Sequence, residues 1–435
     1  MDLAACLEEV VAGLVQPDGR APGTPGGDAA TTFLITALDT RGLGAPTFGR
    51  TQSFAMSARR TTGRGVLTWG GRTRVAGDDW SPVPGSPAGT RIGLILPGAP
   101  SLHNVPLAGA AGPAWWILAN PEFDPVDAIA LRIEPPLATE LAGRPFDVVL
   151  PPARVTGHNV VAWVPGQGAL ADEVVLVVAH RDHLPELGEL VFPGADDNAS
   201  GVAATVCALA AHAAASERAS RRAVLGIWFD GEEDGMWGSA AWVADPGVPL
   251  SQTKAVLALD MVGRLAGSPL VVAGSGAEGW IEAVATSAAP HGLALRPDPT
   301  PSHTDDLTFA VLGIPAAHLF TGHHPDYHRP SDEAVRLDWQ GLTAITAWTV
   351  DLLDWLATTG ALPRPGPGSD SGIRLGGVDP AGRPVLGAVL PGSPADQLGW
   401  HPGDAVVFRD NPTRRVEPCF WLGGLGPFTP DPPHP

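Results

Sequence analysis

The fold is decided by residues 174–201, which read VVLVVAHRDHLPELGELVFPGADDNASG. This segment begins with an apolar, β-branched run from Val174 to Val178, which predicts a buried strand. Histidine and aspartate follow directly, and after a loop the polar residues 196–198 lead into an apolar helical stretch. Open α/β sheets place their ligand crevice where strands end and helices begin. We therefore expect a functional site at the end of this strand.

The rest of the chain repeats the alternation of strands and helices. Strands are expected at 174–179, 223–229, 255–261, 269–273 and 316–320, and helices at 4–16, 29–38, 201–215, 238–243, 278–289 and 339–356. Such alternation implies a largely parallel sheet covered on both faces. The predicted fold class is α/β, with a mostly parallel mixed sheet and helices on both faces. Between about residues 51 and 160, short β-like runs interrupted by Pro and Gly predict a small β-rich insertion.

The composition excludes some classes of partner. The formal net charge is −19 over 435 residues, which argues against nucleic acid and against anionic membrane surfaces. We find no run of 18 apolar residues and no secretory signal. The sequence as written predicts a cytoplasmic protein without a membrane span, or a secreted one if the start site is misassigned. Its oligomeric state is unknown from the sequence.

The three cysteines, Cys6, Cys207 and Cys419, are far apart and odd in number. They form no CxxC pair, so we expect neither a disulfide framework nor a cysteine-based metal site. Cys207 lies in an Ala/Val-rich helical run and is expected to be a core residue.

Histidines and carboxylates follow several of the expected strands. They are His180 and Asp182, residues 230–233, Asp260, and the late word from Tyr327 to Asp332. One such residue at a strand end is usually solvated, but four separate ends with the same chemistry indicate a shared site. Two histidines with three or four carboxylates suit zinc or a similar divalent ion. The excess of carboxylates favours two ions, since one aspartate can bridge them, and a free glutamate can act as general base.

The local sequence words resemble a known family, the two-zinc aminopeptidases of metallopeptidase family 28, which are relatives of glutamate carboxypeptidase. The matching words are VVLVVAHRDHL, PGADDNASGVA, WFDGEEDGMWGS, LALDMVGR, GIPAAHLF and DYHRPSD, and upstream GRAPGTPGG resembles the family's N-terminal GR-x-x-G-S-x-G word. The resemblance covers roughly residues 8–356, interrupted by the insertion. It implies the zinc-exopeptidase, phosphorylase/hydrolase-like fold.

The resemblance also implies a role for each matching residue. His180, Asp197, Glu233, Asp260 and His328 would hold two divalent ions, zinc in the first place, with Asp197 as the bridge. Glu232 would be the general base and acid. Asp182 would orient a ligand, as metal-bound imidazoles usually require. Tyr327 would either stabilise the oxyanion of the tetrahedral intermediate or serve simple packing.

Other polar residues near these motifs are expected to have structural roles. Asp196 is expected to be a turn or cap residue, and Asn198 and Ser200 are expected to cap the helix at 201–215. The nearby histidines His183, His323 and His324 are expected at the rim of the site. One departure from the family concerns its Ser-Asp-His word, where Asp306 stands in place of the histidine and His303 is displaced. We expect this departure to affect the substrate pocket and no metal ligand.

A second resemblance lies near the C-terminus. The words VLGAVLPGSPAD (385–396) and GWHPGDAV (399–406) resemble the central half of a PDZ domain. The Pro-rich tail cannot supply the later helix and strand of that fold, so we do not expect capture of peptides in a PDZ groove.

These observations predict a division of the chain. The expected parts are a two-zinc peptidase domain at 1–50 and 155–360, the β-rich insertion at 51–154 interpreted as a reduced protease-associated-like domain, a linker at 361–370, the partial PDZ-like segment at 371–415, and a Pro/Gly-rich tail at 416–435.

The leading functional hypothesis is a zinc-dependent aminopeptidase acting on peptides. One rival is a carboxypeptidase-type relative, which needs a basic pocket for the terminal carboxylate, for example from Arg264 or Arg181. A second is a relative of glutaminyl cyclase, which uses a single zinc. A third is a non-catalytic binding protein on the same scaffold with a PDZ-like adaptor end.

Overall fold

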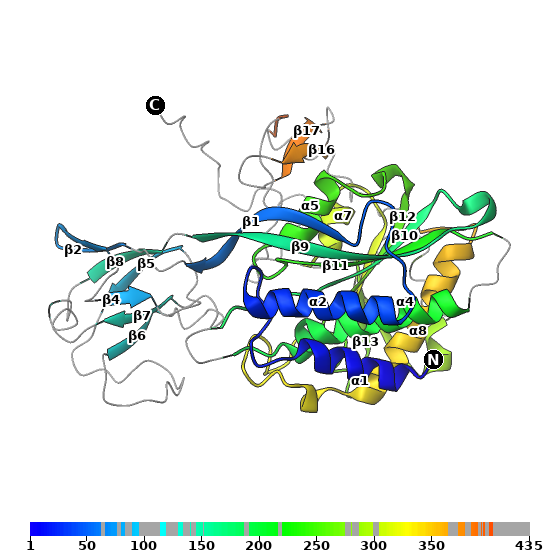
Figure 1. Ribbon diagram of the computed structural model, residues 1–435, viewed down its shortest axis with the longest axis horizontal. Helices are drawn as coiled ribbons and strands as arrows, with labels where there is room; N and C mark the ends of the chain where they lie inside the picture. Colours follow the sequence, from blue (N-terminus) through cyan, green and yellow to red (C-terminus); the bar gives the residue numbers. More distant parts are fainter. Residues whose placement is uncertain are drawn as a thin grey trace.

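The structure is a computed structural model (Figure 1). It describes residues 1–61, 66–75, 80–82, 89–94, 114–118, 129–133, 140, 145–150, 152–186, 191–215, 220–274, 280, 287–298, 304–363, 373–378, 384–389, 393, 395 and 400–402. In these ranges no helix combines the length and the apolar character that crossing a membrane requires. Of the helix expected at 278–289, residues 278, 279 and 281–286 lie outside the described residues.

An eight-stranded sheet forms the centre of the molecule, with the strand order β1-β9-β11-β10-β12-β15-β13-β14. Its strands are β1 (Thr51–Thr61), β9 (Pro152–Val164), β10 (Val174–His180), β11 (Ala223–Phe229), β12 (Thr253–Leu259), β13 (Leu270–Ala273), β14 (Leu295–Asp298) and β15 (Ala316–Phe320). The central strands β11, β10, β12 and β15 are parallel, whereas β1, β9 and the β13–β15 pair contribute antiparallel contacts. The predicted mostly parallel mixed sheet is confirmed.

Strand β10 is central because every one of its seven residues is buried. Successive side chains of a strand point to opposite faces, so an unbroken apolar run can fill two cores at once. Val175 and Val177 pack in the larger core, and Leu176 and Val178 pack in the smaller one on the other face.

Helices cover both faces of the sheet (Figure 1). The larger core is closed by α1 (Leu3–Leu14), α2 (Pro25–Thr40), α4 (Gly201–Ala214) and α8 (Trp339–Thr358), and the smaller one by α5 (Trp237–Ala244) and α7 (Asp306–Ala310). Helix α2 begins at a capped turn, where Thr24 Oγ1 accepts a hydrogen bond from the Gly27 N–H at 3.0 Å. Helix α8 begins in the same way, because Asp338 Oδ1 accepts from the Gly341 N–H at 3.0 Å.

The expectation that the cysteines form no disulfide is wrong for one pair. Cys6 of α1 and Cys207 of α4 are joined by a disulfide, with a sequence separation of 201 positions and 6.1 Å between their Cα atoms. Sequence spacing could not reveal this pair, because only the packing of α1 against α4 brings the two residues together. Cys207 is fully buried, as expected of a core residue.

Strands β1 and β9 form a long antiparallel pair that belongs to the main sheet and extends toward smaller sheets (Figure 1). One small sheet has the order β3-β2-β8-β5 and the other β4-β7-β6. Their strands are β2 (Val66–Trp69), β3 (Arg72–Val75), β4 (Trp80–Pro82), β5 (Gly89–Leu94), β6 (Ala114–Leu118), β7 (Ile129–Ile133) and β8 (Pro145–Leu150). The proposed domain limits at 51 and 154 stay a prediction.

A C-terminal hairpin packs against helix α5 of the main domain. Strands β16 (Ile373–Val378) and β17 (Pro384–Val389) pair antiparallel and contact α5. Ile373 and Leu386 are buried with Met236 and Leu307 in one apolar cluster. The PDZ-like resemblance stays a prediction, since much of 371–415 and the whole tail lie outside the described residues.

Candidate metal centre

The candidate residues are brought together at the carboxyl ends of the central strands. His180 is the last residue of β10, Asp260 follows β12, and residues 230–233 follow β11. Because β10 lies between β11 and β12, these ends are neighbours. Asp197 arrives from the turn that leads into α4, and His328 from the loop after β15.

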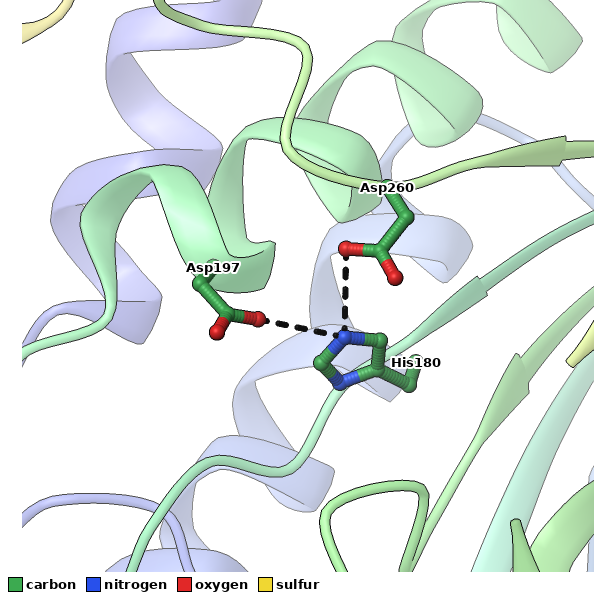
Figure 2. A group of neighbouring side chains, drawn as sticks. All are labelled: His180, Asp197 and Asp260. Atoms are coloured by element: carbon green, nitrogen blue, oxygen red, sulfur yellow. Dashed lines mark ion pairs between the residues drawn. The ribbon is translucent and has the colours of Figure 1, made fainter. Parts of the chain in front are cut away.

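The first donor group consists of His180, Asp197 and Asp260 (Figure 2). His180 Nε2 lies 3.3 Å from Asp197 Oδ1 and 3.3 Å from Asp260 Oδ1. Its other ring nitrogen, Nδ1, lies 3.2 Å from the carbonyl oxygen of Asp182. A bond from Nδ1 to this carbonyl fixes the ring so that Nε2 faces the two carboxylates.

The second donor group uses the other oxygen of Asp197. His328 Nε2 lies 3.2 Å from Asp197 Oδ2 and 3.1 Å from Glu233 Oε2. His183 completes this group, because its Nδ1 lies 2.6 Å from Glu233 Oε1 and 3.9 Å from Asp197 Oδ2. The carboxylate of Asp197 therefore faces both donor groups, one oxygen to each.

The charges in the two groups are strongly coupled. Burial opposes the charged form of His180, but Asp260 and Glu232 outweigh it and raise the pKa of that imidazole well above its ordinary value. Burial and Asp197 act to raise the pKa of Glu233, yet His328 and His183 overcome them and lower it to about 2. The site thus contains ionised carboxylates that require positive charge close by.

Glu232 differs from its neighbour Glu233. Burial raises the pKa of Glu232 well above its ordinary value, His180 opposes this shift, and Glu233 adds to it. Its Oε2 lies 4.0 Å from His180 Nε2, at the edge of the first donor group. A carboxyl group whose proton affinity is raised is suited to accept and return a proton.

Asp182 contacts the backbone that carries both glutamates. Its Oδ1 accepts from the Glu232 N–H at 3.2 Å, and its Oδ2 faces the Glu233 N–H at 3.4 Å. Its Oδ1 also lies 3.8 Å from His180 Nδ1, which is too long for a hydrogen bond. The carboxylate of Asp182 therefore contacts the turn of the glutamates, whereas its carbonyl oxygen contacts the imidazole of His180.

The exposure predicted for two nearby histidines is wrong. His183 is fully buried within the second donor group and is not at the rim. His324 is largely buried and pairs with Asp196, with 3.1 Å between Nε2 and Oδ2. His323 is exposed, as expected of a rim residue. The three-residue spacing of His180 and His183 was a usable signal, but exposure cannot be read from a loop sequence.

The turn before α4 is held more tightly than simple capping predicts. Asn198 does cap α4, since its Oδ1 accepts from the Gly201 N–H at 3.0 Å. Ser200 does not cap it and instead donates to Asp196 and accepts from the Val262 N–H. Asp196 Oδ1 accepts from the Gly263 N–H at 2.6 Å, so this turn is fastened to the loop after β12.

Tyr327 stacks on His328, with 3.7 Å between the ring centroids and 21° between the planes. The role of Tyr327, oxyanion stabilisation or packing, stays a prediction. Asp306, which stands where the family has histidine, is fully buried at the start of α7 and belongs to neither donor group.

The central part of the chain is similar in sequence to known peptidases. Residues 159–353 match the sequence model of peptidase family M28. Leucine aminopeptidase 1 of Trichophyton equinum is 33% identical over 115 residues, and leucine aminopeptidase 1 of Arthroderma otae is 34% identical over 117 residues. Each alignment covers 25% of this chain and 30% of the relative, so the chain spans 30% of the length of these curated relatives.

Comparison with solved structures addresses the fold. A zinc aminopeptidase from Bacillus subtilis has a TM-score of 0.57 at 18% identity, covering 82% of this chain and 96% of its own. A glutaminyl cyclase from Porphyromonas gingivalis has a TM-score of 0.50 at 18% identity, covering 81% and 99%. At this identity the likeness shows a shared fold. The segment 159–353 thus matches peptidase family M28 in sequence, and the chain shares its fold with the two solved structures.

Proposed function

We propose that this chain is a metal-dependent aminopeptidase that holds two divalent ions, zinc in the first place, and hydrolyses the N-terminal bond of peptides. The observation that carries the proposal is the carboxylate of Asp197, whose Oδ1 and Oδ2 face two different histidines at 3.3 and 3.2 Å. The names of the relatives, leucine aminopeptidases and a zinc aminopeptidase, support the same activity.

The donor set fits such ions. His180, Asp197 and Asp260 would hold one ion, and Asp197, Glu233 and His328 the other, while His183 would orient Glu233. All donors are nitrogen or oxygen, as zinc accepts, and cations would neutralise three carboxylates that otherwise repel one another. When bound, the ions would polarise a peptide carbonyl and activate a water molecule.

The chain itself would then move the proton. We assign this role to Glu232, whose carboxylate would take a proton from the attacking water and return it to the leaving amine. Its raised pKa favours holding the proton between these two steps. Asp182 would keep the turn of Glu232 in place through its bonds to the backbone N–H groups.

The arginines needed by the carboxypeptidase alternative are already engaged. Arg181 is buried, with its Nη2 2.5 Å from Asp230 Oδ2. Arg264 is paired with Asp332 and Asp326 at 3.2 and 3.3 Å. A guanidinium that is already neutralised offers little to a terminal carboxylate. This favours recognition of a free amino group by the acidic site.

The proposal is tested by hydrolysis of paired peptides that differ only in a free or an acetylated N-terminus. We expect cleavage of the free-amine peptide alone, loss of activity after treatment with a chelator, and recovery on addition of zinc. Cleavage of the acetylated peptide from its carboxyl end would reject the aminopeptidase assignment. Cyclisation of an N-terminal glutamine without peptide cleavage would favour the cyclase alternative, whose fold is shared. A chain that binds peptides without any turnover would support the binding-protein alternative.

A further inference from the structure

Arg20 is a buried cation beside the candidate metal centre. It lies in the loop between α1 and α2, and its side chain is fully buried. Its guanidinium donates to three carbonyl oxygens, those of Pro193 (2.5 Å), Gly194 (2.6 Å) and Asp197 (2.8 Å). A buried charge is costly unless it is hydrogen-bonded or faces opposite charge, so a fully buried guanidinium in this place calls for an explanation.

The charge that Arg20 faces is that of the site. The carboxylates that act on it include those of Asp197, Asp332 and Glu233. None of the ion pairs found among the described residues includes Arg20 directly, and its contacts are instead to the backbone of the turn that carries Asp197. Arg20 is therefore placed to fix the main chain of this turn, and its charge also interacts with the nearby carboxylates.

Asp332 holds the same turn from the opposite side. It is fully buried, and its Oδ2 accepts from the N–H groups of Asp196 at 2.9 Å and Asp197 at 3.1 Å. Its own carbonyl oxygen accepts from the Ala195 N–H at 3.0 Å. The N–H of Asp197 is thus held by Asp332 and its carbonyl by Arg20, from segments 312 residues apart in the sequence.

The turn leaves little freedom for another path. Gly194 has a φ of +55°, and a Cβ at this position would collide with the Asp197 carbonyl, the His183 ring and the Arg20 guanidinium. Only glycine permits this close approach. The backbone before Asp197 is therefore packed directly against Arg20 and one member of the second donor group.

We propose that Arg20 and Asp332 are positioning residues that fix the main chain of Asp197, so that its two carboxylate oxygens address both donor groups at once. The inference rests on the proposed two-metal function. A bridging carboxylate requires both oxygens in place, so a small rotation of its backbone weakens both ions together. The N-terminal motif GRAPG would thereby supply Arg20, which orients the bridging carboxylate.

The test measures the affinity and stoichiometry of zinc by competition with a chromogenic chelator, together with the absorption spectrum of the cobalt-substituted protein. Both Arg20→Lys and Arg20→Gln are expected to weaken zinc binding about 10- to 100-fold, the usual effect of removing a residue that orients a ligand. Arg20→Lys keeps the positive charge but loses the planar guanidinium. Weakened zinc binding in this variant would therefore show that the hydrogen-bond geometry of Arg20 matters, and not its charge alone. Asp332→Ala should act similarly, and Asp332→Asn, which keeps an acceptor oxygen, should retain most of the affinity.

A matched control is Arg222→Lys. Arg222 is also buried and donates to two carbonyls, those of Leu356 and Thr359, and it pairs in addition with Glu173 at 2.6 Å. The whole length of β11 separates it from Glu232. This variant should lower the melting temperature of the metal-free protein and leave zinc affinity within about twofold.

The outcomes separate the inference from the proposed function. A wild-type chain that binds no metal would overturn both. A wild-type chain with two ions and Arg20 variants with unchanged affinity would overturn the inference alone, as would full retention by Arg20→Lys beside loss by Arg20→Gln, which would reduce the role of Arg20 to its charge. If the Arg20 variants do not fold, the pair Asp332→Ala and Asp332→Asn decides: equal affinity in the two contradicts the inference.

Discussion

The two donor groups of the candidate metal centre are built in different ways. In the first, His180 ends β10 and Asp260 follows the adjacent parallel strand β12, and the ladder between these strands pairs Val178 with Ala258. The register of the sheet therefore sets the distance between the two side chains. In the second, His183, Glu233 and His328 lie on loops and are held by side-chain contacts. The first group depends on the sheet, and the second depends on tertiary contacts between loops.

Asp197 and its neighbours join these two regions. The turn before α4 carries the carboxylate that faces both groups, and it is fastened by Asp332, Arg20 and the loop after β12. The sheet alone places His180 and Asp260 of the first, sheet-borne group. The second, loop-borne group requires further residues that lie outside the sequence motifs.

The largest expected effect comes from a residue that belongs to neither group. Glu232→Gln should lower kcat about 10²- to 10⁴-fold, because the amide cannot accept a proton, and leave both ions bound. Activity assays and metal analysis of the same preparation check this. Near-native turnover in this variant would show that another group acts as the base.

Two histidine variants test whether the two donor groups bind their ions independently. His180→Asn should remove the ion of the sheet-borne group, while His183→Asn should weaken only the ion of the loop-borne group, about 10-fold, because Glu233 loses the partner that orients it. Zinc titration resolves the two ions. Equal losses at both ions in each variant would contradict the separation of the groups.

A pH-dependent effect is expected at Asp305, which is buried near the first group. Burial raises its pKa to about 7 from 3.8, and the charge of His180 opposes this shift. Between these values the folded chain binds a proton that the unfolded chain has released, so the stability falls as the pH rises toward 7. Asp305→Asn should therefore stabilise the metal-free protein by up to about 4 kcal/mol at pH 8 and not at pH 4. Denaturant titrations at both pH values check this, and an equal gain at both would contradict the shift.

A smaller effect is expected behind the turn of Asp197, where the Cys6–Cys207 disulfide joins α1 to α4. Replacing both residues with alanine should cost about 2–4 kcal/mol of stability, the range typical of native disulfides. The first donor group should keep its ion, since β10 and β12 place His180 and Asp260, and Asp332 and Arg20 hold the turn of Asp197 independently of the disulfide. Thermal unfolding and zinc titration check the two statements, and unchanged stability would contradict the first.

The fold could be predicted from the sequence because its strands are long apolar runs. The buried strand expected at 174–179 is found at Val174–His180, and the one expected at 316–320 is found at Ala316–Phe320. Their alternation with helices required a parallel sheet, and the parallel sheet required that the polar residues after each strand meet at one edge. The convergence of His180, Glu233 and Asp260 follows from this physics.

The remaining features depend on contacts that have no local signature. The burial of His183, the disulfide of Cys6 and the hold of Arg20 on Asp197 each join segments far apart in the sequence. Arg20 was visible within the word GRAPG, but nothing in the word shows that its guanidinium reaches residues 193–197. Such partners become visible only once the loops are packed.

The central claim is that one carboxylate, that of Asp197, serves two metal ions. The most direct measurement is the zinc content of the wild-type chain and of Asp197→Asn, determined on protein prepared without chelators. The account predicts two ions per chain in the wild type and the loss of both in the variant. A wild-type chain with a single ion, or a variant that keeps both, would contradict it.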